Sequence, residues 1–125
     1  MARILVVDDS SFMRASLQYL LERAGHKVVG LATGGREAVD LYQRLQPDLV
    51  TMDIVMDDMD GIEALRKIRE VDPGARVVMV TIQHQEQLEQ EARKLGACGY
   101  LKKPLKEAEI LETLEIVFAQ QKVPY

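Results

Sequence analysis

The feature that most constrains the fold is a repeated alternation of short apolar segments with longer stretches of helical spacing. Val, Ile and Leu concentrate in five segments, which are Arg3 to Val7, Lys27 to Ala32, Asp48 to Met52, Arg76 to Thr81 and Gly99 to Lys102. The first, third and fourth are almost continuously apolar, as is typical of strands covered on both faces of a parallel sheet. The second and fifth are more mixed, and we expect them to be outer strands.

Between these segments, apolar residues recur at the spacing of one helical face. The stripes are Met13, Leu17, Leu20, Leu21 and Ala24; Ala38, Leu41, Tyr42 and Leu45; Ile62, Leu65 and Ile68; Leu88, Ala92 and Leu95; and Ile110, Leu111, Leu114, Val117 and Phe118. Five strand–helix units in succession predict right-handed crossovers and one doubly wound α/β sheet. The fourth stripe is thin and lies among Gln85, Gln87, Glu89 and Gln90, which predicts a loosely held helix.

Composition limits the functional classes. The 125 residues suit one domain, 1–125, and a content of 47% hydrophobic and 29% charged residues is typical of a globular chain. A net charge of −4 without a basic run argues against nucleic-acid binding. No apolar run approaches the roughly 20 residues of a membrane span, and Asp8 comes too early for a signal peptide. Cys98 has no partner in the chain, which favours a reducing cytoplasm.

Polar residues stand where the predicted strands end. Asp8 and Asp9 follow the first strand, Asp53 the third, Thr81 ends the fourth, and Lys103 follows the fifth. In a doubly wound sheet these ends lie along one edge, where ligands bind.

Each residue also has an ordinary structural explanation. Asp9, Ser10 or Ser11 could cap the first helix, and Asp53 could be a turn residue. Thr81 could be a β-branched strand end, and Lys102-Lys103-Pro104 a solvated turn. Capping does not require every central strand to end in a polar group, so the convergence favours a site.

The predicted cluster restricts the chemistry. Two carboxylates ~4 Å apart repel by roughly 1 to 4 kcal/mol, so clustered acids raise one another's pKa values or require a cation. Oxygen ligands suit Mg²⁺. The sequence has no cluster of Cys or His residues of the kind that would indicate a zinc site. A carboxylate can attack a phosphoryl group and hold it as a mixed anhydride, while a metal and an ammonium group neutralise the phosphoryl oxygens.

These residues together resemble the receiver domain of bacterial two-component response regulators, particularly the chemotaxis type. The resemblance spans Arg3 to about Phe118 and rests on Val6-Val7-Asp8-Asp9-Ser10, Met52-Asp53-Ile54-Val55-Met56, Met59-Asp60-Gly61, Thr81 and Gly99-Tyr100-Leu101-Lys102-Lys103-Pro104. It implies a flavodoxin-like (βα)5 three-layer sandwich with a five-stranded parallel sheet in the order 2-1-3-4-5. It also implies a signalling switch, which is not an enzyme although it assists its own phosphorylation and dephosphorylation.

The resemblance assigns a role to each site residue. Asp53 is the expected phosphoacceptor. Asp9, Asp53 and the backbone carbonyl of Val55 would bind Mg²⁺, or Mn²⁺, directly, and Asp8 would act mainly through a bound water. Lys103 would pair with the phosphoryl group, and its bond to Pro104 is expected to be cis.

Thr81 and Tyr100 would be the switch residues, the first moving towards the phosphoryl group and the second turning inward behind it. The expected readout surface is built from the fourth helix, the fifth strand and the fifth helix. The implied partners are a sensor histidine kinase or phosphotransfer domain and a downstream protein target, with no nucleic acid or membrane bound.

Two positions depart from the family pattern. Ile82 follows Thr81 where a small residue is usual, and we expect it to slow entry of phosphodonors or water. Asp57 replaces a common proline. Together with Asp58 and Asp60 it could favour capture of a cation or form only a solvated loop, and we expect the solvated loop.

Other functions fit less well. A phosphatase of the haloacid dehalogenase type needs a second acid two residues after the first, where this chain has Val55. A flavin-binding domain needs a Ser/Thr/Gly-rich loop after the first strand. A degenerate receiver that only binds partners, and the receiver part of a DNA-binding regulator or a methylesterase, stay open. His26 and His84 are interpreted as surface residues rather than phosphohistidines.

Overall fold

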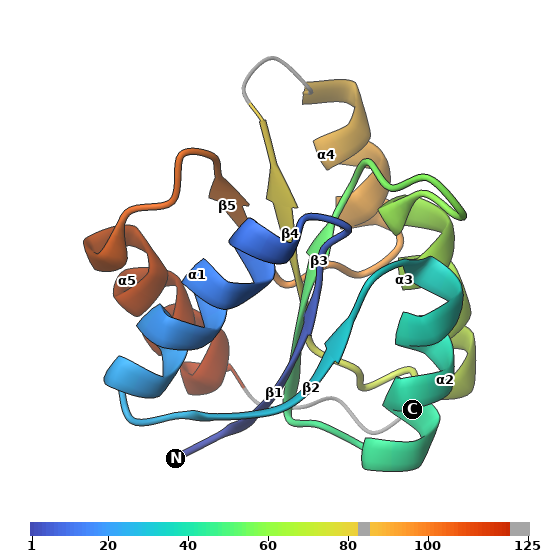
Figure 1. Cartoon of the computed structure of the whole chain (residues 1–125). Helices are drawn as coiled ribbons and strands as arrows, with labels where there is room; N and C mark the ends of the chain where they lie inside the picture. Colours follow the sequence, from blue (N-terminus) through green and yellow to red (C-terminus); the bar gives the residue numbers. More distant parts are fainter. Residues whose placement is uncertain (83–85, 121–125) are drawn as a thin grey trace.

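The computed structural model describes residues 1–82 and 86–120. Predictions for His84 and Gln85 therefore lie outside the described residues. Strands and helices alternate along the chain (Figure 1): β1 (Arg3–Val7), α1 (Ser11–Arg23), β2 (Lys27–Ala32), α2 (Gly35–Leu45), β3 (Leu49–Asp53), α3 (Gly61–Val71), β4 (Val77–Thr81), α4 (Glu86–Lys94), β5 (Gly99–Lys102) and α5 (Glu107–Ala119).

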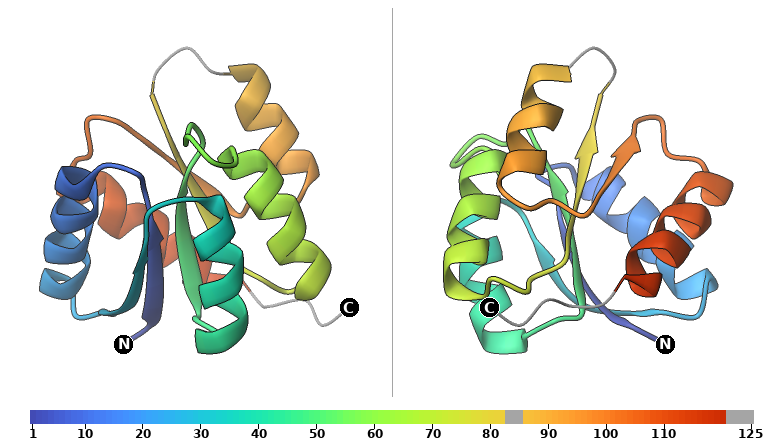
Figure 2. Two further views of the ribbon diagram at one scale, coloured as in Figure 1. Left: turned by 45° about the vertical axis from the view of Figure 1, so that its right-hand side comes forward. Right: turned by 180° about the vertical axis from the view of Figure 1, so that it is seen from behind.

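The strands form one parallel sheet in the order β2-β1-β3-β4-β5. Helices α1 and α5 cover one face, and α2, α3 and α4 cover the other, as the two views in Figure 2 show. The expected (βα)5 three-layer sandwich and its strand order are therefore confirmed.

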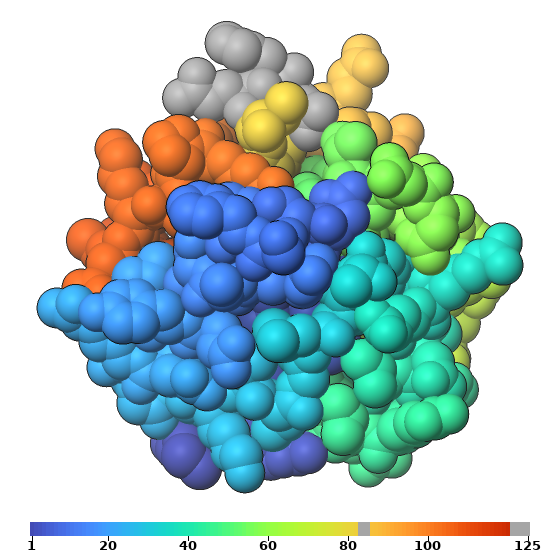
Figure 3. Space-filling view, in the orientation of Figure 1, coloured from blue at the N-terminus to red at the C-terminus, as the bar shows by residue number. Residues whose placement is uncertain are grey.

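Side-chain alternation along each central strand divides the core between the two faces. In β1, Ile4 and Val6 pack into the cluster under α1 and α5, whereas Leu5 and Val7 pack into the cluster under α2, α3 and α4. All four are buried, which explains the continuous apolar run in the sequence. Figure 3 shows one side of the molecule, on which α1 and α2 form much of the surface.

Local signals set the helix ends. The Ser10 hydroxyl accepts a hydrogen bond from the Met13 N–H at 3.3 Å and caps α1. Gly25 and Gly96 follow α1 and α4 with φ of 92° and 99°, a conformation that favours glycine. Among the described residues, no helix combines the length and the apolar content needed to cross a membrane.

Candidate functional site

The predicted site residues meet at the carboxyl edge of the sheet, the upper end in Figure 1. Asp8 and Asp9 follow β1, and Asp53 is the last residue of β3. Thr81 ends β4, and Lys103 directly follows β5. The third strand runs one residue further than predicted, and Asp53 lies opposite Val80 of β4 in the register of the sheet.

Three carboxylates form the centre of the site. Asp8, Asp9 and Asp53 each offer an oxygen atom, and these atoms all lie within 4.8 Å of one another. Asp8 and Asp53 are buried, whereas Asp9 is exposed. The N-cap of α1 is Ser10. Asp9 does not cap this helix, so capping does not explain its position in the cluster.

Asp8 is fixed by the turn that follows β1. Its Oδ1 accepts a hydrogen bond from the Ser10 N–H at 2.9 Å, and its backbone carbonyl accepts one from the Arg14 guanidinium at 2.8 Å. Its other oxygen, Oδ2, is buried and receives no hydrogen bond from the described residues. Its nearest positive charge is the Lys103 ammonium group, whose Nζ lies 3.3 Å away.

Lys103 brings positive charge from the far side of the pocket. Its Nζ lies 3.3 Å from Asp8 Oδ2 and 3.4 Å from Asp53 Oδ2. The backbone positions this side chain, because the Lys103 N–H donates to the Thr81 carbonyl at 2.8 Å and the Lys103–Pro104 bond is cis, as expected. One ammonium group thus faces two buried carboxylates, and the pocket keeps an excess of negative charge.

The Asp53 carboxylate lies in an environment that disfavours its charge. Burial raises the pKa of Asp53 to about 6, and the neighbouring charge of Asp8 acts in the same direction. Lys103 and a hydrogen bond from the Val55 N–H oppose this rise in the pKa. These oxygen ligands and their mutual repulsion fit a hard divalent cation such as Mg²⁺.

The two expected switch residues lie on neighbouring strands. Thr81 is buried, and its hydroxyl donates to the Ile82 carbonyl at 3.1 Å. Tyr100 is half-buried on β5, and its hydroxyl donates to the Glu89 carbonyl of α4 at 3.0 Å. The Arg93 guanidinium lies 4.6 Å from the centre of the Tyr100 ring. Tyr100 therefore links β5 to α4.

The segment after β3 departs from one expectation. Asp57 is exposed, as expected, but Asp58 and Asp60 are not merely solvated. The Asp60 carboxylate accepts a hydrogen bond from the Glu63 N–H at 2.8 Å and caps α3. Asp58 accepts hydrogen bonds from Gly35 and Arg36. The spacing of Asp60 and Glu63 matches a capping signal, whereas the partners of Asp58 lie too far along the chain to be inferred locally.

The remaining site positions lie at the surface. Val55 is 58% exposed and Ile82 is 54% exposed. The expected effect of Ile82 on access to the pocket stays a prediction.

Comparisons with known proteins agree with this geometry. A model of the response regulator receiver domain family matches residues 4–115. Protein CcdB of Bacillus subtilis is 46% identical over 117 residues, which cover 94% of this chain and 98% of that protein. The chemotaxis protein CheY of Thermotoga maritima is 43% identical over 115 residues, which cover 92% of this chain and 96% of that protein.

A similar solved structure is a chain of the CheX-CheY-BeF3-Mg²⁺ complex of Borrelia burgdorferi. Its TM-score is 0.91 at 37% sequence identity, and the match covers 94% of this chain and 90% of that chain. The matched family model spans most of the sequence, and the relatives are similar along nearly their whole length. This chain therefore belongs to the response regulator receiver domain family and is a CheY-like signalling domain, not a classical enzyme.

Proposed function

We propose that this chain is a chemotaxis-type switch in which Asp53 accepts a phosphoryl group in a Mg²⁺-dependent reaction. The observation that carries the proposal is the meeting of Asp8, Asp9 and Asp53 within 4.8 Å, with Lys103 beside two of them. The CheY relatives support the chemotaxis role, and the Borrelia burgdorferi complex supports Mg²⁺. The domain extends over 1–125 in this proposal, and its place of action is the cytoplasm.

Asp53 is the nucleophile. An Asp53 carboxylate oxygen attacks the phosphorus of a phosphohistidine on a sensor kinase or phosphotransfer domain, forming a new O–P bond. The P–N bond breaks, and its electron pair leaves with the imidazole, which then takes up a proton. The Lys103 ammonium compensates charge on the phosphoryl oxygens.

The acidic residues would hold the cation. Asp9, Asp53 and the Val55 carbonyl bind it directly, and Asp8 acts through a water molecule, with Mn²⁺ as a substitute. When bound, Mg²⁺ neutralises charge on the transferring group. The approach of Asp8, Asp9 and Asp53 oxygens to within 4.8 Å of one another supports this assignment.

The signal then passes to α4 through Thr81 and Tyr100. The Thr81 hydroxyl exchanges its bond to the Ile82 carbonyl for one to the phosphoryl group, and Tyr100 turns into the space behind it. This turn breaks the bond from Tyr100 to Glu89 and releases α4. Hydrogen bonds to a charged group contribute roughly 1.5 to 3 kcal/mol each, which shifts a two-state equilibrium about ten- to a hundredfold.

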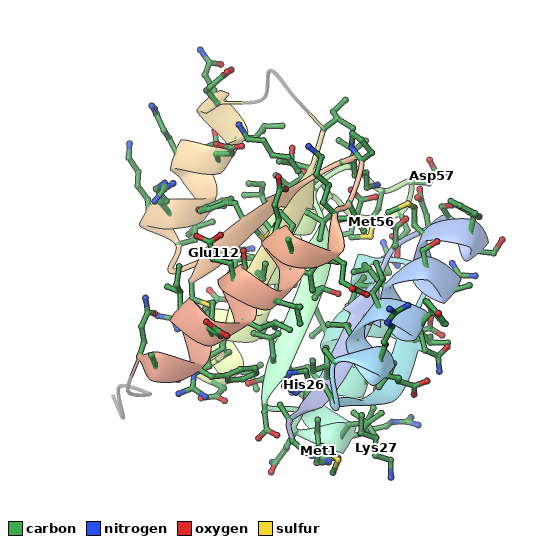
Figure 4. The ribbon with its side chains drawn as sticks, turned by 90° about the vertical axis from the view of Figure 1, so that its left-hand side faces the viewer. Met1, His26, Lys27, Met56, Asp57 and Glu112 are labelled. Carbon is green, nitrogen blue, oxygen red and sulfur yellow. The ribbon has the colours of Figure 1, made fainter. Side chains whose placement is uncertain are left out.

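The readout surface comprises α4, β5 and α5. A groove of about 530 Å³ lies on it, and its lining includes Tyr100, Lys102, Lys106, Glu109, Glu112 and Ile116. Glu112 of α5, labelled in Figure 4, belongs to this lining. Ile116 is 54% exposed and is surrounded by both signs of charge, a composition that suits a protein target rather than nucleic acid or membrane.

Intact mass spectrometry tests the proposal. After incubation with acetyl phosphate and Mg²⁺, the chain should gain the mass of one phosphoryl group. The gain should disappear in Asp53→Asn and in the presence of a chelator. A gain that persists in Asp53→Asn would show that the acceptor is another residue.

A further inference from the structure

The segment between β3 and α3, residues 54–60, is the β3–α3 loop, and it carries one of the proposed metal ligands. The proposed function assigns the Val55 carbonyl to Mg²⁺, and the Val55 backbone also acts on the pKa of Asp53, which it lowers. Backbone ligands have no side-chain freedom with which to correct a displaced loop. Whatever fixes the path of this loop therefore fixes one side of the metal site.

Both ends of the loop are anchored locally. The Gly61 N–H donates to the Ile54 carbonyl at 2.6 Å, and Asp60 caps α3. A Cβ on Gly61 would lie 2.1 Å from the Asp53 carbonyl oxygen, so α3 begins directly against the end of β3. These contacts fix the ends of the loop, and between them Met56 is buried in the core, with Met59 packed against the same cluster.

Asp58 anchors the middle of the loop to a different element. Its Oδ1 accepts a hydrogen bond from the Gly35 N–H at 3.0 Å, and its Oδ2 accepts one from the Arg36 N–H at 3.2 Å. These are the first N–H groups of α2, whose own N-cap, Gly34, provides no side-chain hydrogen bond. Asp58 thus caps α2 from a neighbouring loop, at the helix end where the dipole also favours a negative charge.

The two chain segments fit closely at this contact. A Cβ on Gly34 would lie 2.4 Å from Asp58 Oδ1, and one on Gly35 would lie 2.8 Å from the Met59 Cβ. Desolvation raises the pKa of Asp58, but hydrogen bonds from the N–H groups of Arg36, Gly35 and Met59 outweigh it and lower the pKa overall. The carboxylate is therefore held in its charged form.

We propose that Asp58 is a positioning residue for the metal site, because it anchors the β3–α3 loop to the N-terminus of α2 and so holds the Val55 backbone in place. The inference rests on the proposed function, which assigns the Val55 carbonyl to Mg²⁺. It also accounts for the tolerance of Asp57 at a position where the family commonly has proline. An anchor on another element replaces the stiffness that a proline ring would give the loop.

The chain offers a matched control next to Asp58. Asp57 carries the same charge in the same loop, and Figure 4 shows its side chain at the outer surface. Asp57→Ala and Asp58→Ala remove equal charge near the metal, but only the second removes the hydrogen bonds to α2. The experiment is Mg²⁺ titration of both variants by isothermal calorimetry, together with amide hydrogen exchange of the metal-free proteins.

Asp58→Ala should weaken Mg²⁺ binding about tenfold. This is the low end of the roughly 10- to 100-fold loss of affinity that follows removal of a group orienting a metal ligand. It should also speed exchange at the Gly35, Arg36 and Val55 amides. Asp57→Ala should leave exchange at these amides unchanged and Mg²⁺ affinity within about twofold, since it removes charge alone. Asp58→Asn, which keeps one acceptor oxygen, should fall between the wild type and Asp58→Ala, and it provides the same comparison if Asp58→Ala does not fold.

Equal loss of Mg²⁺ affinity in Asp57→Ala and Asp58→Ala would overturn the inference, because charge would then explain both. Unchanged affinity in Asp58→Ala would overturn it as well. A wild-type chain that binds no Mg²⁺ would instead refute the metal site of the proposed function. The exchange data from the metal-free proteins would still show whether Asp58 anchors the loop.

Discussion

At the scale of single residues, the Asp53 carboxylate is the proposed phosphoacceptor, and its charge lowers the free energy of unfolding because the group is buried. Its pKa of about 6 lies above the ordinary value because the group is buried beside Asp8. The folded chain therefore holds this proton in a range of pH where the unfolded chain has released it. The free energy of unfolding should fall as the pH rises from about 4, the unfolded pKa, through about 6.

Asp53→Asn should remove this cost. In the presence of a chelator at pH 7.5, the variant should be more stable than the wild type by about 1 to 2 kcal/mol, and the difference should shrink as the pH falls towards 4. Urea denaturation at several pH values provides the measurement. A difference that does not change with pH would show that burial of the charge is not the cause.

A hydrogen bond between Tyr42 and Asp72 stabilises the end of the molecule opposite the site. Tyr42 is buried on α2, and its hydroxyl donates to Asp72 Oδ2 at 2.7 Å, just beyond α3. Tyr42→Phe should lower the free energy of unfolding by about 1 to 2 kcal/mol, because a partly buried carboxylate loses a donor. Urea denaturation measures the change, and Tyr19→Phe, at a tyrosine that is 61% exposed, is the control with little expected effect.

At the scale of the elements, α4 is the helix with the weakest hold on the core. Ala92 is its one fully buried residue, and the bond from Tyr100 to the Glu89 carbonyl adds a polar contact. Tyr100→Phe should weaken this hold by about 0.5 to 1.5 kcal/mol. Hydrogen exchange should then become faster at the amides of α4 and stay unchanged in α3. Unchanged exchange in α4 would mean that Tyr100 does not restrain the helix.

The strands were the most predictable elements, and the β3–α3 loop was the least. Apolar runs such as Ile4 to Val7 report burial on both faces, and this is a local property of the sequence. The site acids were predictable because strand ends in a parallel sheet share an edge. The anchor of Asp58 was not, since its partners lie 22 and 23 residues away and meet it only through tertiary packing.

At the scale of the whole molecule, metal binding and folding should be linked, because the acids of the site come from β1 and β3. Mg²⁺ at a hundredfold excess over its dissociation constant should stabilise the fold by about 2.7 kcal/mol. Thermal denaturation with Mg²⁺ and then with a chelator measures this gain. Asp9→Asn should reduce the gain strongly and Asp57→Asn only slightly. Equal gains in the two variants would place the ion elsewhere.

The position of Lys103 has a consequence for synthesis of the chain. Its ammonium group follows Asp53 by 50 residues and reaches the pocket only when β5 has docked at the edge of the sheet. During synthesis the three acids, Asp8, Asp9 and Asp53, therefore leave the ribosome before Lys103, which balances part of their charge. The acidic pocket therefore receives its lysine only after β5 has been synthesised and has joined the sheet beside β4.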